Sequence, residues 1–273
     1  MRYKIGDVAK ILGISTDIIR YYEQKGIVSP QRDEDNDYRY YDTWDTNNLI
    51  DCIWYKHYGF GIDQISHMLS EYTRDDLLDC LDEKTREMEQ ELHRQQLLLE
   101  RIRQHRNAIA GFENYLGKCD MRYRPTLIYY LNRHNAAYYN RSDLQRLSLR
   151  WQEYMPFTKR YFEVPESYAE NPDVGYSWGF SLDMHYVDEF KIQVRDPIHH
   201  LPSCYCIHSG FKSSGKNAFT PHHLDYMFQY ARENGYEVAG KACGRLVCSV
   251  VDEGKVTGFF EAWLPVEKKE EQA

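Results

Sequence analysis

The sequence has no long apolar run. Apolar stretches such as residues 97–99 are far shorter than the roughly 20 residues that a membrane-spanning helix needs. The opening MRYKIGDVAKILG also lacks the apolar region of a signal peptide. Mean hydropathy is −0.72, and 28% of the residues are charged. These absences predict a soluble, non-secreted protein without a membrane partner.

The seven cysteines are odd in number and form no CxxC pair. This usage disfavours a disulfide framework and predicts a reducing, cytoplasmic location. Cys119 has no cysteine close to it in the sequence, and Cys204 and Cys206 share a face only because strand side chains alternate. Soft-metal sites need several converging ligands, so we expect neither a metal site nor a cofactor.

A basic excess is also missing. The 273 residues carry a net charge of −8, and residues 1–76 contain nine Lys and Arg against fourteen Asp and Glu, a net −5. A nucleic-acid interface would therefore depend on a few local cations rather than on the overall charge.

Residues 77–116 contain no proline and no glycine before Gly111, and they are rich in good helix formers. They predict one long helix. A heptad that starts at Leu81 gives an apolar a row and a poor d row that includes Leu92 and Leu99. Such a seam predicts pairing with a second copy of the helix, and the alternative is a solvated rod between domains.

Two short helices are expected before this segment. IGDVAKIL over residues 5–12 ends at Gly13, and Ser15 or Thr16 caps the next helix, which ends at Gly26. This pattern fits a helix-turn-helix and equally an ordinary helical hairpin. The stretch SPQRDEDNDYRYYD predicts a hairpin-like wing.

Residues 3–70 resemble the DNA-binding domain of MerR-type transcription regulators. The resemblance is carried by RYYE at residues 20–23, EQKGIVSPQR, YRYY at 38–41 and GFGIDQI, while Asp37 stands where the family often has glycine. It implies a second helix in the major groove, a wing on phosphates, an antiparallel coiled-coil homodimer, and action on promoter DNA with RNA polymerase through DNA distortion.

The matching positions supply the DNA-contact candidates. Thr16 and Asp17 begin the second helix and are candidates for base edges. Phosphate contacts are assigned to three cations and four tyrosine hydroxyls, of which Tyr22 is the one most expected in the core. These residues are Arg20, Arg39, Lys56, Tyr21, Tyr22, Tyr38 and Tyr40.

After Gly117 the sequence turns to β-rich runs and carries fourteen of the 24 tyrosines. LPSCYCIHSG, NGYEVAG and FFEAWLPV resemble the GyrI-like effector domain of BmrR-type multidrug regulators. That resemblance places Glu261, four residues before Pro265, in an aromatic pocket that takes cationic drugs.

Strand alternation places Phe259, Glu261 and Trp263 on one face. A carboxylate between aromatics is costly to bury without a positive partner. The other predicted pocket residues are Tyr176, Trp178, Phe180, Tyr186 and Tyr205. The alternative is that these rings form core and that Glu261 is exposed or paired with arginine.

The sequence thus predicts an α+β regulator in three parts: a winged helix-turn-helix domain (1–76), a coiled-coil dimerisation helix (77–117) and a GyrI-like ligand-binding domain (118–273). The expected effector is bulky, hydrophobic and cationic, and no enzyme activity is required. The alternative is a GyrI-like small-molecule hydrolase or drug-sequestering protein, in which Glu261 together with His208 or a tyrosine serves as general base.

Overall fold

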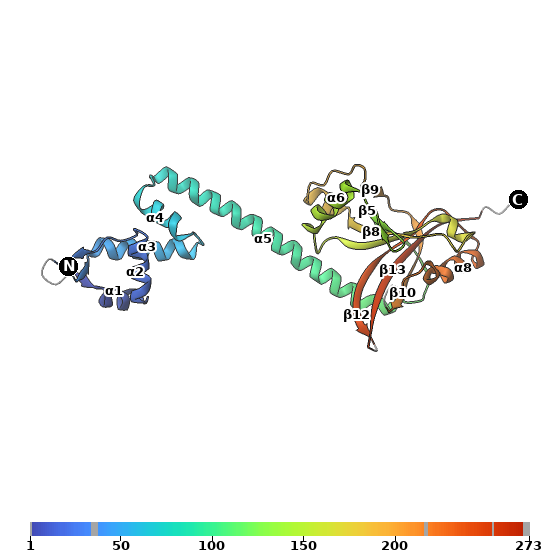
Figure 1. The fold of residues 1–273 in the computed structure, drawn as a ribbon, viewed down its shortest axis with the longest axis horizontal. Coiled ribbons are helices and arrows are strands. Elements are labelled where there is room, and N and C mark those ends of the chain that lie inside the picture. Colours follow the sequence, from blue (N-terminus) through green and yellow to red (C-terminus); the bar gives the residue numbers. More distant parts are fainter. Residues whose placement is uncertain (1, 34–37, 216–217, 253, 270–273) are drawn as a thin grey trace. The chain divides into compact units, whose positions relative to one another are not determined.

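The computed structural model describes residues 2–33, 38–215, 218–252 and 254–269. Contacts divide the chain into two compact units, Met1–His93 and Arg94–Ala273, whose helices and strands are shown in Figure 1. Helices and antiparallel strands are both present, which confirms the α+β class. Across the described ranges, no helix has the length and apolarity to cross a membrane.

The first unit is a small helical domain with a three-stranded sheet. Its elements are β1 (Tyr3–Lys4), α1 (Ile5–Leu12), α2 (Thr16–Gln24), β2 (Gln31–Arg32), β3 (Arg39–Tyr41), α3 (Thr43–His57) and α4 (Ile62–Ser70). Gly13 ends α1 at φ 67°, a left-handed conformation that favours glycine. The Ser15 hydroxyl then accepts the Ile18 amide and caps α2. The expected helix-turn-helix geometry is therefore present.

The predicted wing is also a hairpin. Strand β3 pairs with both β1 and β2, and Arg32 lies opposite Arg39. Asp37, where the sequence departs from the family pattern, lies outside the described residues. The wing strand is anchored by the fully buried ring of Tyr41.

The long helix α5 runs over Arg74–Gly111, which differs from the predicted segment at both ends. It begins earlier because Thr73 and Asp76 cap each other's backbone amides. It ends at Gly111 because Phe112 is buried between the rings of Tyr115 and Phe259, both 5.1 Å away.

The second unit is built on one ten-stranded sheet in the order β4-β10-β13-β12-β7-β8-β5-β6, with β11 paired to β13 and β9 to β5. The strands are β4 (Asp120–Tyr123), β5 (Leu127–His134), β6 (Ala137–Tyr138), β7 (Lys159–Val164), β8 (Ser177–Asp183), β9 (His199–Leu201), β10 (Tyr205–Ser214), β11 (Tyr236–Val238), β12 (Ala242–Asp252) and β13 (Lys255–Lys268). The helices are α6 (Ser142–Gln152), α7 (His185–Glu189) and α8 (Asp225–Glu233), with short 3₁₀ turns at Phe112–Asn114, Glu166–Ala169 and Pro221–Leu224.

The strand register defines two faces of this sheet. On one face, α8 packs against Phe162 and Phe260, and α6 packs against Tyr130. We call it the helix face. The other face carries a cross-strand row in which Arg245 of β12 lies between Tyr161 and Glu261. We call it the Glu261 face, because paired residues project to the same side of a sheet.

Candidate functional site

The DNA-contact candidates on α2 lie on its accessible surface, except Tyr22. Thr16 is half-buried, whereas the side chains of Asp17 and Arg20 are exposed and form an ion pair of 2.9 Å. Tyr21 is exposed, and its ring lies 6.0 Å from the Lys25 ammonium. Tyr22 packs into the core, and burial raises its pKa. Its hydroxyl is therefore a poor donor to an external phosphate in this conformation.

The wing candidates are linked to α2 through Arg39, whose Nε donates to the Glu23 carboxylate at 2.9 Å. Tyr38 is exposed, and the Lys4 ammonium lies 5.7 Å from its ring. Lys4 is a further cation at the wing that the sequence did not predict. The pairing of β1 with β3 places it opposite Tyr40.

Lys56 is exposed in the last turn of α3. The first unit thus presents cations and hydroxyls from α2, the wing and α3 despite its negative net charge. Because Arg20 and Arg39 already face carboxylates, a phosphate at either residue has to compete with a protein partner. Such local, pre-oriented groups can position a duplex without an overall basic surface.

The second unit contains a hydrogen-bonded series of side chains, Asp120–His208–Glu261, at the Glu261 face. His208 is fully buried, and its two ring nitrogens lie 2.9 Å from Glu261 Oε1 and 2.9 Å from Asp120 Oδ1. Arg122 bonds the same Asp120 carboxylate. Although burial works against it, hydrogen bonds from Arg122 and His208 lower the pKa of Asp120. A neutral imidazole has one N–H, so donation to both carboxylates requires the imidazolium.

A cavity of about 580 Å³ opens beside these three side chains. Glu261 and Trp263 line it, together with further charged side chains. Asp183 lies 3.0 Å from Lys159 and 2.6 Å from Arg245. Burial opposes ionisation of Asp183, but the two cations outweigh it and lower its pKa. Burial and the charge of Arg245 lower the pKa of Lys159.

Two carboxylates line the described part of this cavity. Asp183 pairs with Lys159 and Arg245, whereas the partner of Glu261 is His208. The side chain of Glu261 is 28% exposed. The Arg245 guanidinium lies 5.7 Å from the Trp263 ring. The cavity can therefore hold a molecule that has both apolar surface and charge, with Glu261 free to meet a cation on its open side.

The eight predicted ligand residues do not share this cavity, which corrects their grouping. Phe259, Glu261 and Trp263 lie on the Glu261 face, but Trp178 pairs with Phe162 and therefore lies on the helix face. Tyr176 packs with Trp178, and Phe180 packs beside Tyr130. Tyr186, in α7, is buried and packs against Phe157. Tyr205 is exposed, and its ring contacts that of Tyr123. Alternation fixes faces within one strand, whereas the register between strands decides which residues meet.

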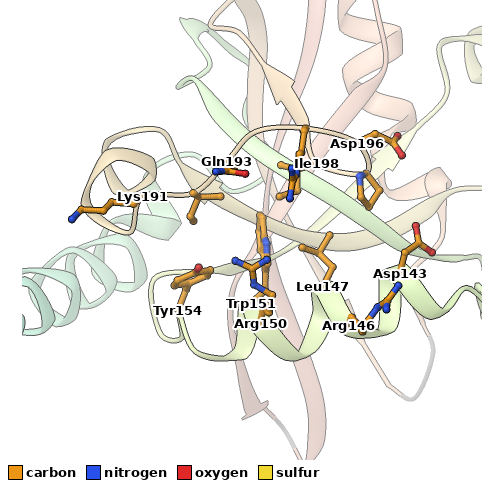
Figure 2. Close-up of a pocket in the computed structure, with 13 residues that line it drawn as sticks. Asp143, Arg146, Leu147, Arg150, Trp151, Tyr154, Lys191, Gln193, Asp196 and Ile198 are labelled. Carbon is orange, nitrogen blue, oxygen red and sulfur yellow. The ribbon is translucent and has the colours of Figure 1, made fainter.

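Two further cavities flank α6. One, of about 500 Å³, lies between α6 and residues 191–198; Figure 2 shows its lining, which includes Arg146, Arg150 and Lys191. The other, of about 520 Å³, has no charged side chain among the described residues that line it. Of the predicted ligand residues, Phe180 lines the second of these two cavities.

The cysteines show no converging metal ligands where the chain is described: no group of three or more His, Cys, Asp or Glu side chains is placed to hold an ion. Burial raises the pKa of Cys119 to about 11, so its thiol is protonated at neutral pH. Metal independence remains a prediction.

Comparisons with known proteins match the N-terminal unit to regulators. The model of the MerR HTH family regulatory protein matches residues 3–72. The HTH-type transcriptional regulator CueR of Escherichia coli O157:H7 is 30% identical over 112 residues, which cover 40% of this chain and 80% of that protein. Heavy metal-dependent transcription regulator 2 of Rhizobium meliloti is 36% identical over 66 residues, 24% of this chain and 45% of that protein.

A solved structure of an EcmrR–DNA complex has a TM-score of 0.38 and 16% identity, and the alignment covers 98% of this chain and 100% of that one.

Proposed function

This chain belongs to the MerR family of helix-turn-helix regulators, and from that premise we propose that it is a homodimer whose control of transcription depends on a small molecule bound to its second unit. Its DNA-binding, transcription-regulating role follows from the family. The dimer, the effector and the response of RNA polymerase are the proposed parts. The relatives that it matches are transcription regulators rather than enzymes.

The dimer is supported by apolar side chains exposed along α5. Leu92 is 60% exposed and Leu99 is 48% exposed, and Met88, Ile102 and Ile109 are exposed as well. Isolated exposed apolar residues are common, but five at heptad-like spacing on one helix form a stripe that a second copy would cover. An antiparallel coiled coil would then place two helix-turn-helix motifs on one duplex.

DNA binding is proposed to use α2 in the major groove and the wing on the backbone. Thr16 and Asp17 stand at the start of α2 and can reach base edges, while Arg20, Arg39 and Lys56 provide charge for phosphates. The contact between Arg39 and Glu23 couples the wing to α2, so the two elements are expected to engage DNA together.

The second unit is proposed to be a GyrI-like effector domain, and one observation carries the proposal: a roomy cavity beside Glu261 and Trp263 in a chain that also carries a helix-turn-helix. The ligand expected there is bulky and largely apolar. Its cationic group would lie against Glu261, whose partner is the buried His208. The nearby pair of Lys159 and Arg245 is offset by Asp183 only in part, so purely polar cations are expected to bind poorly.

Ligand and DNA are linked if each favours the same dimer conformation, and this linkage is reciprocal. A thermal-shift screen of lipophilic cations, with neutral and anionic compounds of similar size, tests the effector class. A ligand that binds the folded state preferentially raises its melting temperature. The proposal requires cations to give shifts that fall when Glu261 is replaced with glutamine, and each such hit to change the affinity of the protein for DNA. Hits that leave DNA affinity unchanged would separate binding from regulation.

The Asp120–His208–Glu261 chain also supports the rival hydrolase reading, because an imidazole between two carboxylates can move a proton. The hydrolase reading requires multiple turnovers of a screened ligand. A regulator leaves the ligand unchanged. Chromatography of each hit after incubation with the protein distinguishes the two.

A further inference from the structure

The helix face carries a second cavity, of about 590 Å³, that the effector proposal leaves unused. Its lining includes the rings of Trp178, Phe219 and Phe260, which pack edge to face or tilted at 4.8–6.0 Å. The Tyr176 hydroxyl donates to the Phe219 carbonyl and fixes one wall. Such a floor is rigid and apolar, as small-molecule sites usually are.

Two guanidinium groups line the same cavity. Arg133 lies between two rings, 5.2 Å from the centre of Trp178 and 5.6 Å from that of Tyr138. Its buried Nε has no hydrogen-bond partner among the described residues. Arg160 reaches the Ser249 hydroxyl at 3.3 Å.

The site has cations without counter-charges. Its described lining includes no aspartate or glutamate, and neither Arg133 nor Arg160 forms an ion pair with a described residue. Burial lowers the pKa of Arg160, and the nearby positive charge of Arg133 lowers it further. The two guanidinium groups are therefore close enough to repel each other. An anion between them would relieve this repulsion and supply an acceptor to the buried Nε. A ligand cation would meet two like charges, and the face of Trp178 is already occupied by Arg133.

We infer that this cavity is a second ligand site, distinct from the Glu261 cavity, and that it takes an aromatic organic anion such as a carboxylate or sulfonate. The anionic group is held by Arg133 and Arg160, which suit planar or forked oxygen acceptors. The rings rest on the aromatic floor. The uncharged cavity beside α6 shares Asn132, Tyr138 and Phe180 with this site, so an apolar extension of the ligand has room to continue there.

A pair of fluorescent probes tests the site in the full-length protein. The anion is 8-anilinonaphthalene-1-sulfonate, and the neutral partner is N-phenyl-1-naphthylamine, which has the same rings without the sulfonate. Arg133→Gln and Arg160→Gln should each raise the dissociation constant of the sulfonate by at least about tenfold, the size expected when a charged hydrogen bond is lost. The neutral probe should change by less than about twofold, because the apolar contacts remain.

Matched variants control for net charge and folding. Arg146→Gln removes an arginine from the cavity in Figure 2 and should leave both probes unchanged. Arg133→Lys keeps the charge and should recover most of the sulfonate affinity. Glu261→Gln should not weaken the sulfonate, which distinguishes this site from the Glu261 cavity. Equal losses for both probes, an equal loss in Arg146→Gln, or no sulfonate binding to the wild type would overturn the inference.

Discussion

Replacing Glu261 with glutamine removes one charge from the proposed effector cavity and keeps the side chain's shape. The glutamine oxygen can still accept from His208 Nε2, now 2.9 Å from Glu261 Oε1. A neutral hydrogen bond replaces a charge-assisted one, so the folded state should lose about 1 kcal/mol of stability. The fold is expected to persist, and ligand selectivity is the quantity to measure.

The expected effect on binding follows from the charge and its exposure. A ligand cation about 4 Å from a carboxylate gains roughly 4 kcal/mol at an effective dielectric constant near 20. Glu261 is 28% exposed, and the ligand's own desolvation opposes the gain. We therefore expect a loss of about 1–3 kcal/mol for a cation, or roughly 5- to 150-fold in dissociation constant.

Isothermal titration with a quaternary ammonium ligand and its neutral tert-butyl isostere isolates this term. In Glu261→Gln, the affinity for the cation should fall, and the affinity for the isostere should change by less than about twofold. Glu163→Gln is the matched control, because Glu163 lies on the same face and pairs with Lys241 at 2.7 Å but does not line the cavity. If the two ligands weaken equally in Glu261→Gln, the residue supports the fold and does not select charge.

Three other predictions concern the dimer, the wing and metal ions. Replacing Leu92 and Leu99 with glutamate should give folded monomers by light scattering that no longer bind a two-fold site; a monomeric wild type would contradict the dimer. Arg39→Ala should weaken binding to all duplexes alike and reduce the salt slope by about one, and unchanged binding would remove the wing from the interface. Cys119→Ser should leave the ligand response intact, whereas lost response together with lost tight zinc or copper binding would establish a metal sensor.

The local structure of this chain was largely predictable from its sequence. Capping residues and glycines set the limits of the first helices, and Gly13 adopts the left-handed turn that its position required. The β-rich runs after residue 117 became strands, for example YCIHSG as part of β10 and FFEAWLPV as part of β13. These features depend on neighbours within a few residues, which a single sequence displays.

Long-range register was not predictable, and it determines the candidate sites. Trp178 and Glu261 were assigned to one pocket but lie on opposite faces, because β8 pairs with β7 in the register that sets Trp178 beside Phe162. Asp120 and His208 are 88 residues apart in the chain, and only the pairing of β4 with β10 brings them together. A single sequence shows neither pairing.

We propose that a dimer of this chain recognises a specific two-fold DNA sequence. Selection of duplexes from a random library by the purified protein, followed by sequencing, tests it most directly. We expect enrichment of an inverted repeat with a fixed spacing between half-sites, and loss of enrichment when both Leu92 and Leu99 are replaced with glutamate. Enrichment of a single half-site, or of no sequence at all, would contradict it.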